Sequence, residues 1–271
     1  MSSSLNDTKP LKANQIAITE DITISYYHSI GEKDLILLFL HGLGSSKEDY
    51  YQIFYYNKLK VNNIIIPDLV GHGESSKPPN FSYSIDDQAK ILYQLLERLS
   101  LKSNIILVAH SLGGPIAISL AELLSDRVVG LIYAEGNIDV GDCFFTKFVI
   151  DSFSLEKWEE IGFEQSLAEI RKDPDLADFA ISFAKAGAIT IYKSSEDLVR
   201  VSIEDTLLDR LTQLSIPILA IFGAKNKDKF SSEKKLQSKF PIQYIPEAGH
   251  GMMVDNPRVF YKTIIDFLEQ Y

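Results

Sequence analysis

Apolar residues along the chain occur in two kinds of pattern. Several short runs are almost continuously apolar, which is typical of strands buried on both faces of a parallel sheet. These runs are Leu35–Leu40, Asn63–Pro67, Asn104–Ala109, Val128–Ala134 and Ile218–Phe222. Apolar and polar residues alternate across Ile16–Ser29, which indicates an antiparallel hairpin at the sheet edge, and Gln243–Ile245 predicts a last short strand.

Helical patterns lie between these runs. Apolar residues form one stripe along Ser84–Leu101, and Gly114–Leu124 is small and apolar, as in a helix that packs under a sheet. Pro257–Leu268 begins with proline, which is well tolerated in the first turn of a helix. Strands that alternate with helices predict βαβ units, so the expected fold class is α/β with a doubly wound, mostly parallel sheet.

One region breaks this alternation. Between Gly136 and Leu208 the sequence shows no core strand, only short helical patterns that are rich in phenylalanine and interrupted at Pro174. An all-helical insertion that follows a strand is expected to cover the edge of the sheet where ligands bind. We therefore predict a core made of residues 1–135 and 209–271, with a helical cap made of residues 136–208.

Composition and charge narrow the class of protein. The chain has 271 residues, of which 45% are hydrophobic and 24% charged, enough for one large core with a small cap. Its N-terminus is polar and it lacks an apolar run of about 18 residues, so we expect a cytoplasmic protein with no membrane span. The net charge of −10 argues against a general affinity for nucleic acid or anionic membranes.

The strongest chemical signal is the segment AHSLGG, which joins an apolar run directly to a helical pattern. A serine on such a sharp turn requires small residues two positions to either side, and Ser111 has Ala109 and Gly113 there. Alanine replaces the first glycine of the G-x-S-x-G motif, a sterically mild departure. The turn lifts the Ser111 hydroxyl above the sheet and directs the next N–H groups at an oxyanion, so Ser111 is the candidate nucleophile.

A second signal, HGLG, ends the buried run that begins at Leu35. Glycines at the end of a strand let the backbone approach a ligand closely. We expect the N–H groups of Leu43 and Leu112 to form an oxyanion hole. The further residues that we expect to contact a substrate are His41, Gly42, His110 and Trp158. A further set of aromatic residues follows this loop, and we expect about half of them to wall an apolar pocket together with the cap and the others to be helix core: Tyr50, Tyr51, Phe54, Tyr55 and Tyr56.

A histidine late in the chain is the candidate general base. The chain has 5 histidines, and His250 alone lies in a glycine-flanked loop that precedes the last helical pattern. Its place gives the order serine, acid, histidine that a nucleophilic turn of this kind requires. An imidazole on a loop combines a pKa near neutrality with the freedom to reach a hydroxyl group.

Together these segments resemble the α/β-hydrolase superfamily. The HGLG loop, the stretch PDLVGHGESSKP, the AHSLGG turn and the tail AGHGMMVDNP occur in the order and spacing of that family. The resemblance covers nearly all of residues 20–271, with 136–208 in the place of the variable lid. It implies a Ser–His–acid triad with Ser111 as the nucleophile, and it implies no metal ion and no organic cofactor. Relatives with an aspartate nucleophile are disfavoured because Ser111 occupies that position.

The acid of this triad has three candidates. The family usually carries it in a G-x-x-D turn after the strand that corresponds to Ile218–Phe222, but that turn here ends in Asn226. Asp228 is two residues further on, among lysines, and Asn226 itself is a neutral amide that stabilises an imidazolium poorly. Glu135 ends the run Val128–Ala134, beside the strand of the nucleophile. We favour Glu135, keep Asp228 as the alternative, and interpret Asn226 as a loop residue that is free to vary.

The expected function is that of a serine hydrolase. Its substrate would be a carboxylic ester or thioester of a small to medium acyl group, cleaved through a Ser–His–Glu or Ser–His–Asp triad and an acyl-enzyme. A hydrolase or lyase of carbon–carbon bonds with the same triad is one alternative. The other is a catalytically weak ligand-binding protein of the same fold, suggested by the missing aspartate at position 226.

Overall fold

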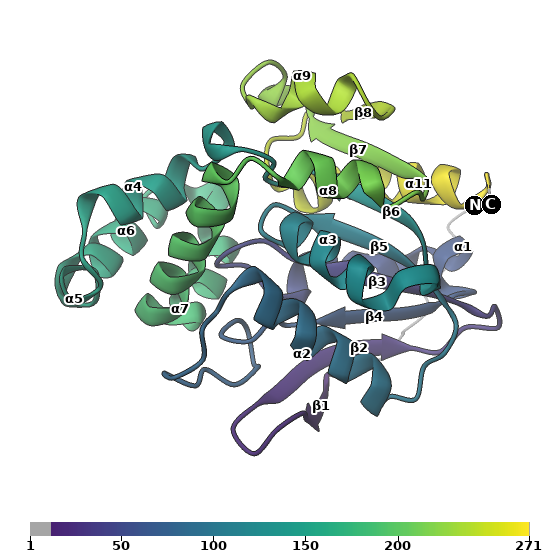
Figure 1. The fold of residues 1–271 in the computed structure, drawn as a ribbon, viewed down its shortest axis with the longest axis horizontal. Coiled ribbons are helices and arrows are strands. Elements are labelled where there is room, and N and C mark those ends of the chain that lie inside the picture. The colour runs from purple at the N-terminus through teal and green to yellow at the C-terminus, as the bar shows by residue number, and fades with distance from the viewer. Residues whose placement is uncertain (1–11, 271) are drawn as a thin grey trace, which may run out of the picture.

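A single central sheet organises the computed structural model, which describes residues 12–270 (Figure 1). Within these residues its strands are β1 (Asn14–Ala17), β2 (Thr23–Ser29), β3 (Leu35–Leu40), β4 (Asn63–Pro67), β5 (Asn104–His110), β6 (Val128–Ala134), β7 (Ile218–Gly223) and β8 (Ile242–Ile245). They lie in the order β1-β2-β4-β3-β5-β6-β7-β8. The pairs β1–β2 and β2–β4 are antiparallel and the remaining pairs are parallel, so the predicted fold class is confirmed.

The continuous apolar runs follow from burial on both faces of the sheet. Strand β3 illustrates this, because successive side chains of a strand point to opposite faces. Leu38 and Leu40 pack toward the side of α2 and α3, whereas Leu37 and Phe39 pack toward the side of α11. All four side chains are fully buried. Neither face of β3 therefore tolerates a polar residue, which is why the run lacks the alternation seen at the sheet edge.

Helices form a layer on each face of the sheet, and others connect the strands at its ends (Figure 1). On one face lie α2 (Ile85–Arg98), α3 (Gly113–Leu124) and α8 (Leu207–Gln213). On the other lie η1 (Lys47–Tyr55), α1 (Asn57–Lys60), α10 (Met252–Asp255) and α11 (Pro257–Leu268). The short connecting elements are η2 (Ser125–Arg127), η6 (Ala224–Asn226) and α9 (Ser232–Gln237).

Capping residues define where the long core helices begin. The Ser84 hydroxyl accepts a hydrogen bond from the backbone N–H of Asp87 at 3.2 Å, so α2 begins at Ile85. The Asn256 side chain caps α11 in the same way, and proline follows at the first helical position. Both helices match their predicted positions, although α2 ends three residues before Leu101.

Only helices occur between β6 and β7 in the described structure. They are η3 (Val140–Asp142), α4 (Phe144–Ser152), α5 (Leu155–Lys157), the π-helical turn η4 (Trp158–Gly162), α6 (Phe163–Ile170), η5 (Pro174–Leu176) and α7 (Ala177–Ile203), followed by α8. Helices α4 to α7 group together at one end of the sheet, at the left of Figure 1. Helix α7 is broken at Gly187, whose φ of 77° lies outside the helical region.

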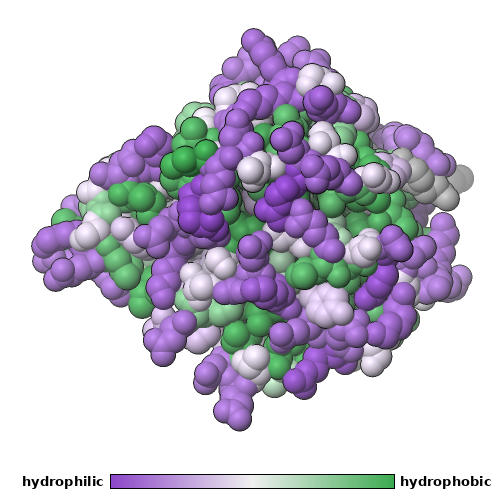
Figure 2. Space-filling model, viewed as in Figure 1, coloured by the Kyte–Doolittle hydropathy of each residue, from purple (hydrophilic) through white to green (hydrophobic). Residues whose placement is uncertain are grey.

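The helices α4 to α7 enclose an apolar cluster of their own, with Trp158, Phe163, Phe183 and Ile191 at its centre. Figure 2 shows a largely hydrophilic surface that is interrupted by apolar patches on this part of the molecule. In the helix α4, Phe144 is 61% exposed and Phe148 is 50% exposed. The division of the chain into a core and a cap at residues 136 and 208 stays a prediction. Among residues 12–270 no helix combines the length and the apolar character needed to cross a membrane.

Candidate active site

Ser111 occupies a strained turn between β5 and α3. Its φ is 52°, a left-handed value that is uncommon for a residue with a side chain. Its N–H donates to the Ala134 carbonyl at 3.1 Å, and its own carbonyl accepts from the N–H of Gly114 at 2.8 Å. A Cβ atom on Gly113 would lie 2.6 Å from the Leu40 carbonyl oxygen, so only glycine lets α3 start this close to β3. Local hydrogen bonds and close packing together hold the Ser111 turn in place.

The HGLG loop packs directly against this turn. A Cβ atom on Gly42 would lie 3.1 Å from the Ser111 Cβ, so the loop backbone and the serine are near neighbours. Leu43 lines the cavity in front of Ser111. In residues 12–270, the N–H groups of Leu43 and Leu112 donate no hydrogen bond to another protein group. Both N–H groups therefore lack a protein partner among the described residues.

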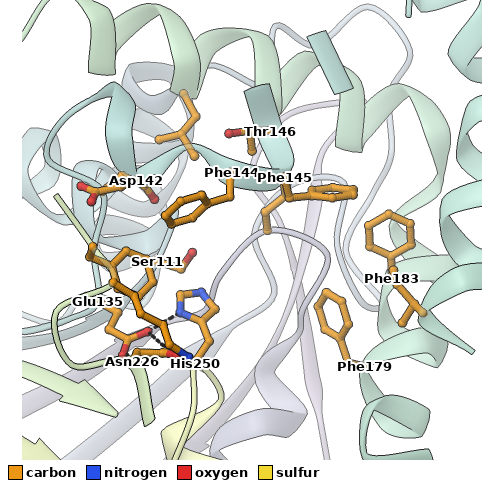
Figure 3. A pocket seen from close by; sticks show the side chains of 16 residues that line it. Ser111, Glu135, Asp142, Phe144, Phe145, Thr146, Phe179, Phe183, Asn226 and His250 are labelled. Atoms are coloured by element: carbon orange, nitrogen blue, oxygen red, sulfur yellow. Dashed lines mark hydrogen bonds and ion pairs between the residues drawn. The ribbon is translucent and has the colours of Figure 1, made fainter. Parts of the chain in front are cut away.

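His250 and Glu135 form the closest polar contact at the site (Figure 3). The Nδ1 atom of His250 lies 2.5 Å from Oε2 of Glu135, and because the carboxylate accepts, Nδ1 donates. The Glu135 side chain is fully buried, whereas that of His250 is 45% exposed. The N–H of Glu135 donates to the Ile221 carbonyl at 2.9 Å, which ties the end of β6 to β7. The arrangement leaves the Nε2 atom of His250 as the nitrogen able to accept a proton.

Two further groups donate hydrogen bonds to the buried carboxylate. The backbone N–H of Gly223 donates to Oε1 of Glu135 at 2.7 Å. The Asn226 amide donates to both carboxylate oxygens, at 3.2 Å to Oε1 and 3.0 Å to Oε2. Asn226 is therefore not a loop residue without a role, because a buried charge requires such partners. The sequence offered a signal for this role, since Asn226 lies three residues after the end of β7, a strand that pairs with β6.

The two candidate carboxylates lie in different environments. Asp228 is exposed on the loop after β7 and is not among the residues that line the cavity. Its backbone N–H donates to Oε2 of Glu233 at 2.6 Å, which ties the loop to α9. The structure brings Glu135, and not Asp228, to His250.

A cavity of about 730 Å³ opens in front of Ser111 (Figure 3). It is lined by Leu43, Ser111, Glu135, Asn137, Asp142, Phe144, Phe145, Thr146, Ile170, Phe179, Phe183, Leu198, Asn226, Lys229, Phe230 and His250. Most of its wall is apolar, and most of the phenylalanines come from α4 and α7. The sequence shows that this region is rich in phenylalanine, but it does not separate the residues that line the cavity from those that form the core of the cap.

His41 lies behind the loop and not in the cavity. Its ring is fully buried, Nδ1 donates to the Gly42 carbonyl at 2.8 Å, and Nε2 accepts from the N–H of Leu69 at 3.0 Å. Burial lowers the pKa of His41 to about 4, since a charged ring would lose its hydration. Gly42 also lies outside the cavity lining. Both residues shape the loop. The structure therefore does not support the predicted contact between the substrate and either His41 or Gly42.

His110 supports the loop that carries His250. Its Nε2 donates to the His250 carbonyl at 2.9 Å, and the two rings lie 4.5 Å apart. Burial, with a smaller contribution from His250, holds the pKa of His110 well below its usual value. His110 is thus a neutral, buried ring beside Ser111, and it is not among the cavity-lining residues. Because it contacts both the serine turn and the His250 loop, it brings these two segments together.

Trp158 and the aromatic residues at positions 50–56 lie away from the cavity. Trp158 is fully buried inside the cap cluster, where its indole N–H donates to the Ala188 carbonyl at 3.0 Å. Tyr50 is also fully buried, and its hydroxyl donates to the Leu40 carbonyl at 3.1 Å. Tyr50, Tyr51, Phe54 and Tyr56 belong to the cluster on the α11 side of the sheet, and Tyr55 is largely exposed. None of these residues lines the cavity, which corrects the prediction for Trp158 and for the tyrosine cluster.

Comparison with known proteins identifies the family. A family model described as "alpha/beta hydrolase fold" matches residues 36–147. Lipase 1 of Psychrobacter immobilis is 40% identical over 266 residues, which cover 86% of this chain and 77% of the relative. An esterase from Thermogutta terrifontis, solved with malate bound, has a TM-score of 0.74 at 21% identity and covers 96% of this chain and 98% of its own. The esterase EaEST of Exiguobacterium antarcticum has a TM-score of 0.74 at 19% identity, with coverage of 92% and 96%.

The chain belongs to the α/β-hydrolase family. The predicted resemblance and the prediction that the protein is a hydrolase are therefore confirmed. The fold that these relatives share is a mostly parallel sheet with helices on both faces, as described above for this chain.

Proposed function

We propose that this protein is a serine hydrolase that cleaves a carboxylic ester or thioester of a small to medium acyl group. Ser111 is the nucleophile, His250 the general base and acid, and Glu135 the acid of the triad. One observation carries the proposal, the hydrogen bond of 2.5 Å between His250 Nδ1 and the buried carboxylate of Glu135, two residues that line the same cavity as Ser111. A carboxylate in that position gives the imidazole the tautomer and the electrostatic support that proton transfer from serine requires.

The choice of an ester rests on a relative and on the cavity. Lipase 1 of Psychrobacter immobilis is named for an activity on esters, and it is 40% identical to this chain. The cavity of about 730 Å³ is lined largely by apolar side chains, among them Phe145, Phe179 and Phe183. Such a wall suits a hydrocarbon acyl group, because its burial removes apolar surface from water.

Acylation follows from the arrangement of the side chains. The Nε2 atom of His250 takes the hydroxyl proton of Ser111 while the serine oxygen forms a bond to the carbonyl carbon of the substrate. The carbonyl oxygen becomes an oxyanion, which accepts hydrogen bonds from the N–H groups of Leu43 and Leu112. The carbon–oxygen or carbon–sulfur bond then breaks, and the leaving group takes the proton from Nε2. An acyl group remains on Ser111.

Deacylation repeats these steps with water. His250 removes a proton from a water molecule, whose oxygen attacks the acyl carbon and forms a second oxyanion. The bond to Ser111 breaks, the serine oxygen recovers a proton from Nε2, and a carboxylic acid leaves. In both halves Glu135 stays ionised and stabilises the imidazolium that forms for a short time.

A labelling experiment tests the nucleophile. A fluorophosphonate probe forms a covalent bond with a serine only if that serine is activated. We expect labelling of the wild-type chain at Ser111, together with hydrolysis of p-nitrophenyl esters that falls off as the acyl chain becomes longer than the cavity accepts. Ser111→Ala should abolish both signals. Folded wild-type protein that is not labelled would exclude the serine hydrolase and favour a ligand-binding protein.

A further inference from the structure

The end of β7 carries an amide in the position where the family's acid usually lies. Asn226 is half-buried at the end of the short helix η6 and lines the cavity. Its Nδ2 atom lies 3.2 Å from Oε1 and 3.0 Å from Oε2 of Glu135. The hydrogen-bond partner of the amide is therefore the carboxylate and not the imidazole. The amide bridges both carboxylate oxygens.

We propose that Asn226 is a positioning residue for the reaction, acting as a neutral donor that holds the Glu135 carboxylate in the rotation that engages His250. The proposal rests on the proposed function, in which His250 is the base. Asn226 touches neither the substrate nor the reacting atoms in this role, and it acts only through Glu135.

The geometry of the carboxylate explains why a third donor is needed. Gly223 N–H holds Oε1 alone, and His250 holds Oε2 alone. The last torsion of a glutamate side chain has broad minima, so one donor on each oxygen restrains its rotation weakly. Asn226 bridges the two oxygens and fixes the plane of the carboxylate. Without this bridge, Oε2 of Glu135 would face His250 for only part of the time.

The neutrality of Asn226 is as important as its hydrogen bonds. An aspartate at position 226 would place a second carboxylate about 3 Å from Glu135, where like charges interact strongly. The two carboxylates and His250 would then titrate as one coupled group. The added negative charge would raise the pH at which this group loses its last proton. Because an unperturbed histidine is more basic than an unperturbed aspartate, the imidazole would hold most of that proton and would be unable to act as a base.

Few other ionisable groups surround His250. His110 faces it at 4.5 Å between ring centroids, and its pKa lies far below neutrality, so it stays uncharged. Asp142 and Lys229 also line the cavity, and Phe230 stacks on the imidazole with 5.9 Å between ring centroids. Asp255 accepts a hydrogen bond from the N–H of Gly249, the residue before His250, at 2.7 Å. Of these carboxylates, Glu135 is the one that forms a hydrogen bond with the imidazole. A second negative charge at position 226, beside Glu135, would change the protonation of His250.

The experiment compares the pH dependence of kcat/KM for a p-nitrophenyl ester in the wild type and in variants at position 226. For Asn226→Asp we expect the acid limb of the profile to move upward by about one pH unit, with activity recovered at higher pH. For Asn226→Leu, which keeps the size of the side chain and removes the donor, we expect kcat to fall about 10- to 100-fold at every pH.

A matched control separates the effect of a charge next to Glu135 from the effect of a change in net charge. Ala224→Asp adds the same charge two residues away at an exposed position in η6, where water screens it. Its acid limb should coincide with that of the wild type. Thermal denaturation of each variant shows whether it is folded, and a loss of stability alone would lower the amount of active enzyme without moving the limb.

The possible outcomes keep the two proposals apart. If the wild type shows no Ser111-dependent hydrolysis, the proposed function fails. If the wild type is active and Ser111→Ala is not, the role of Asn226 is overturned by either of two results. One is an acid limb in Asn226→Asp that coincides with the wild-type limb, and the other is a kcat in Asn226→Leu within about twofold of the wild type.

Discussion

The ends of β6 and β7 lie side by side at one edge of the sheet, but they carry different kinds of side chain. The two strands pair in parallel, with Ala134 opposite Ile221, so both reach the same edge of the sheet. The end of β6 presents Glu135, a fully buried carboxylate with three kinds of donor around it. The end of β7 presents Asn226, which donates to that carboxylate, and then Asp228, which faces solvent.

The edge of the sheet, and not a local motif, therefore determines where an acid can serve. His250 lies on a loop that meets both strand ends, and its hydrogen bond identifies which carboxylate is within reach. A carboxylate that is shielded from water interacts more strongly with an imidazolium than an exposed one does. The buried end of β6 is therefore the better place for the charge, and the end of β7 supplies donors that stabilise it.

The largest effect should come from removing the charge at the end of β6. We expect Glu135→Gln to lower kcat by about 10³- to 10⁴-fold, because an amide neither fixes the reactive tautomer nor stabilises the imidazolium. The measurement is the turnover of an ester substrate, with thermal denaturation to show that the variant is folded. Near wild-type turnover in this variant, combined with an inactive Asp228→Asn, would mean that the acid lies at the end of β7.

An intermediate effect should come from crowding the junction between β7 and the His250 loop. A Cβ atom on Gly223 would overlap the carbonyl oxygen of Gly249, which is backbone and cannot move aside cheaply. We expect Gly223→Ala to lower the free energy of unfolding by about 1–3 kcal/mol and to lower kcat, because the N–H that holds Glu135 is displaced.

The neighbouring glycine provides a control for this crowding. A Cβ atom on Gly249 would meet only Asp255 Oδ2 at 3.5 Å, an ordinary contact. Gly249→Ala should therefore keep both stability and activity close to the wild type, as measured by denaturant unfolding and by kcat. Equal losses of stability and kcat in Gly223→Ala and Gly249→Ala would show that alanine is tolerated at neither position. The close contact at Gly223 would then have no special role.

The smallest effect should come from the exposed carboxylate. Asp228 has a φ of 62°, a left-handed conformation that asparagine also adopts readily, so Asp228→Asn keeps the loop geometry. Its side chain faces solvent, and we expect kcat to stay within about twofold of the wild type. A loss comparable to that of Glu135→Gln would contradict the contrast between the two strand ends.

Local patterns in the sequence were sufficient to predict most of the fold and the nucleophile. The bounds of β3, β4, β6 and α11 agree with the predicted ones, because burial on both faces and capping act on neighbouring residues. The turn at Ser111 was predictable for the same reason, since its small neighbours lie within two positions of it.

The parts of the site that were not predicted depend on contacts between remote segments. Trp158 and Phe183 are both aromatic cap residues, yet Trp158 is sealed inside the cap and Phe183 also lines the cavity. Nothing in the local sequence distinguishes them, because the difference arises from how α4 to α7 pack on the sheet. The role of Asn226 likewise depends on Glu135, which is 91 residues away in the chain.

Proton NMR detects the hydrogen bond between Glu135 and His250 itself. A strong hydrogen bond from an imidazole N–H to a carboxylate shifts its proton to low field, and specific isotope labelling of histidine assigns it. We expect one such resonance from His250 Nδ1–H in the wild type and in Asp228→Asn, and its loss in Glu135→Gln. A resonance that persists in Glu135→Gln and disappears in Asp228→Asn would mean that Asp228, and not Glu135, accepts the hydrogen bond from His250.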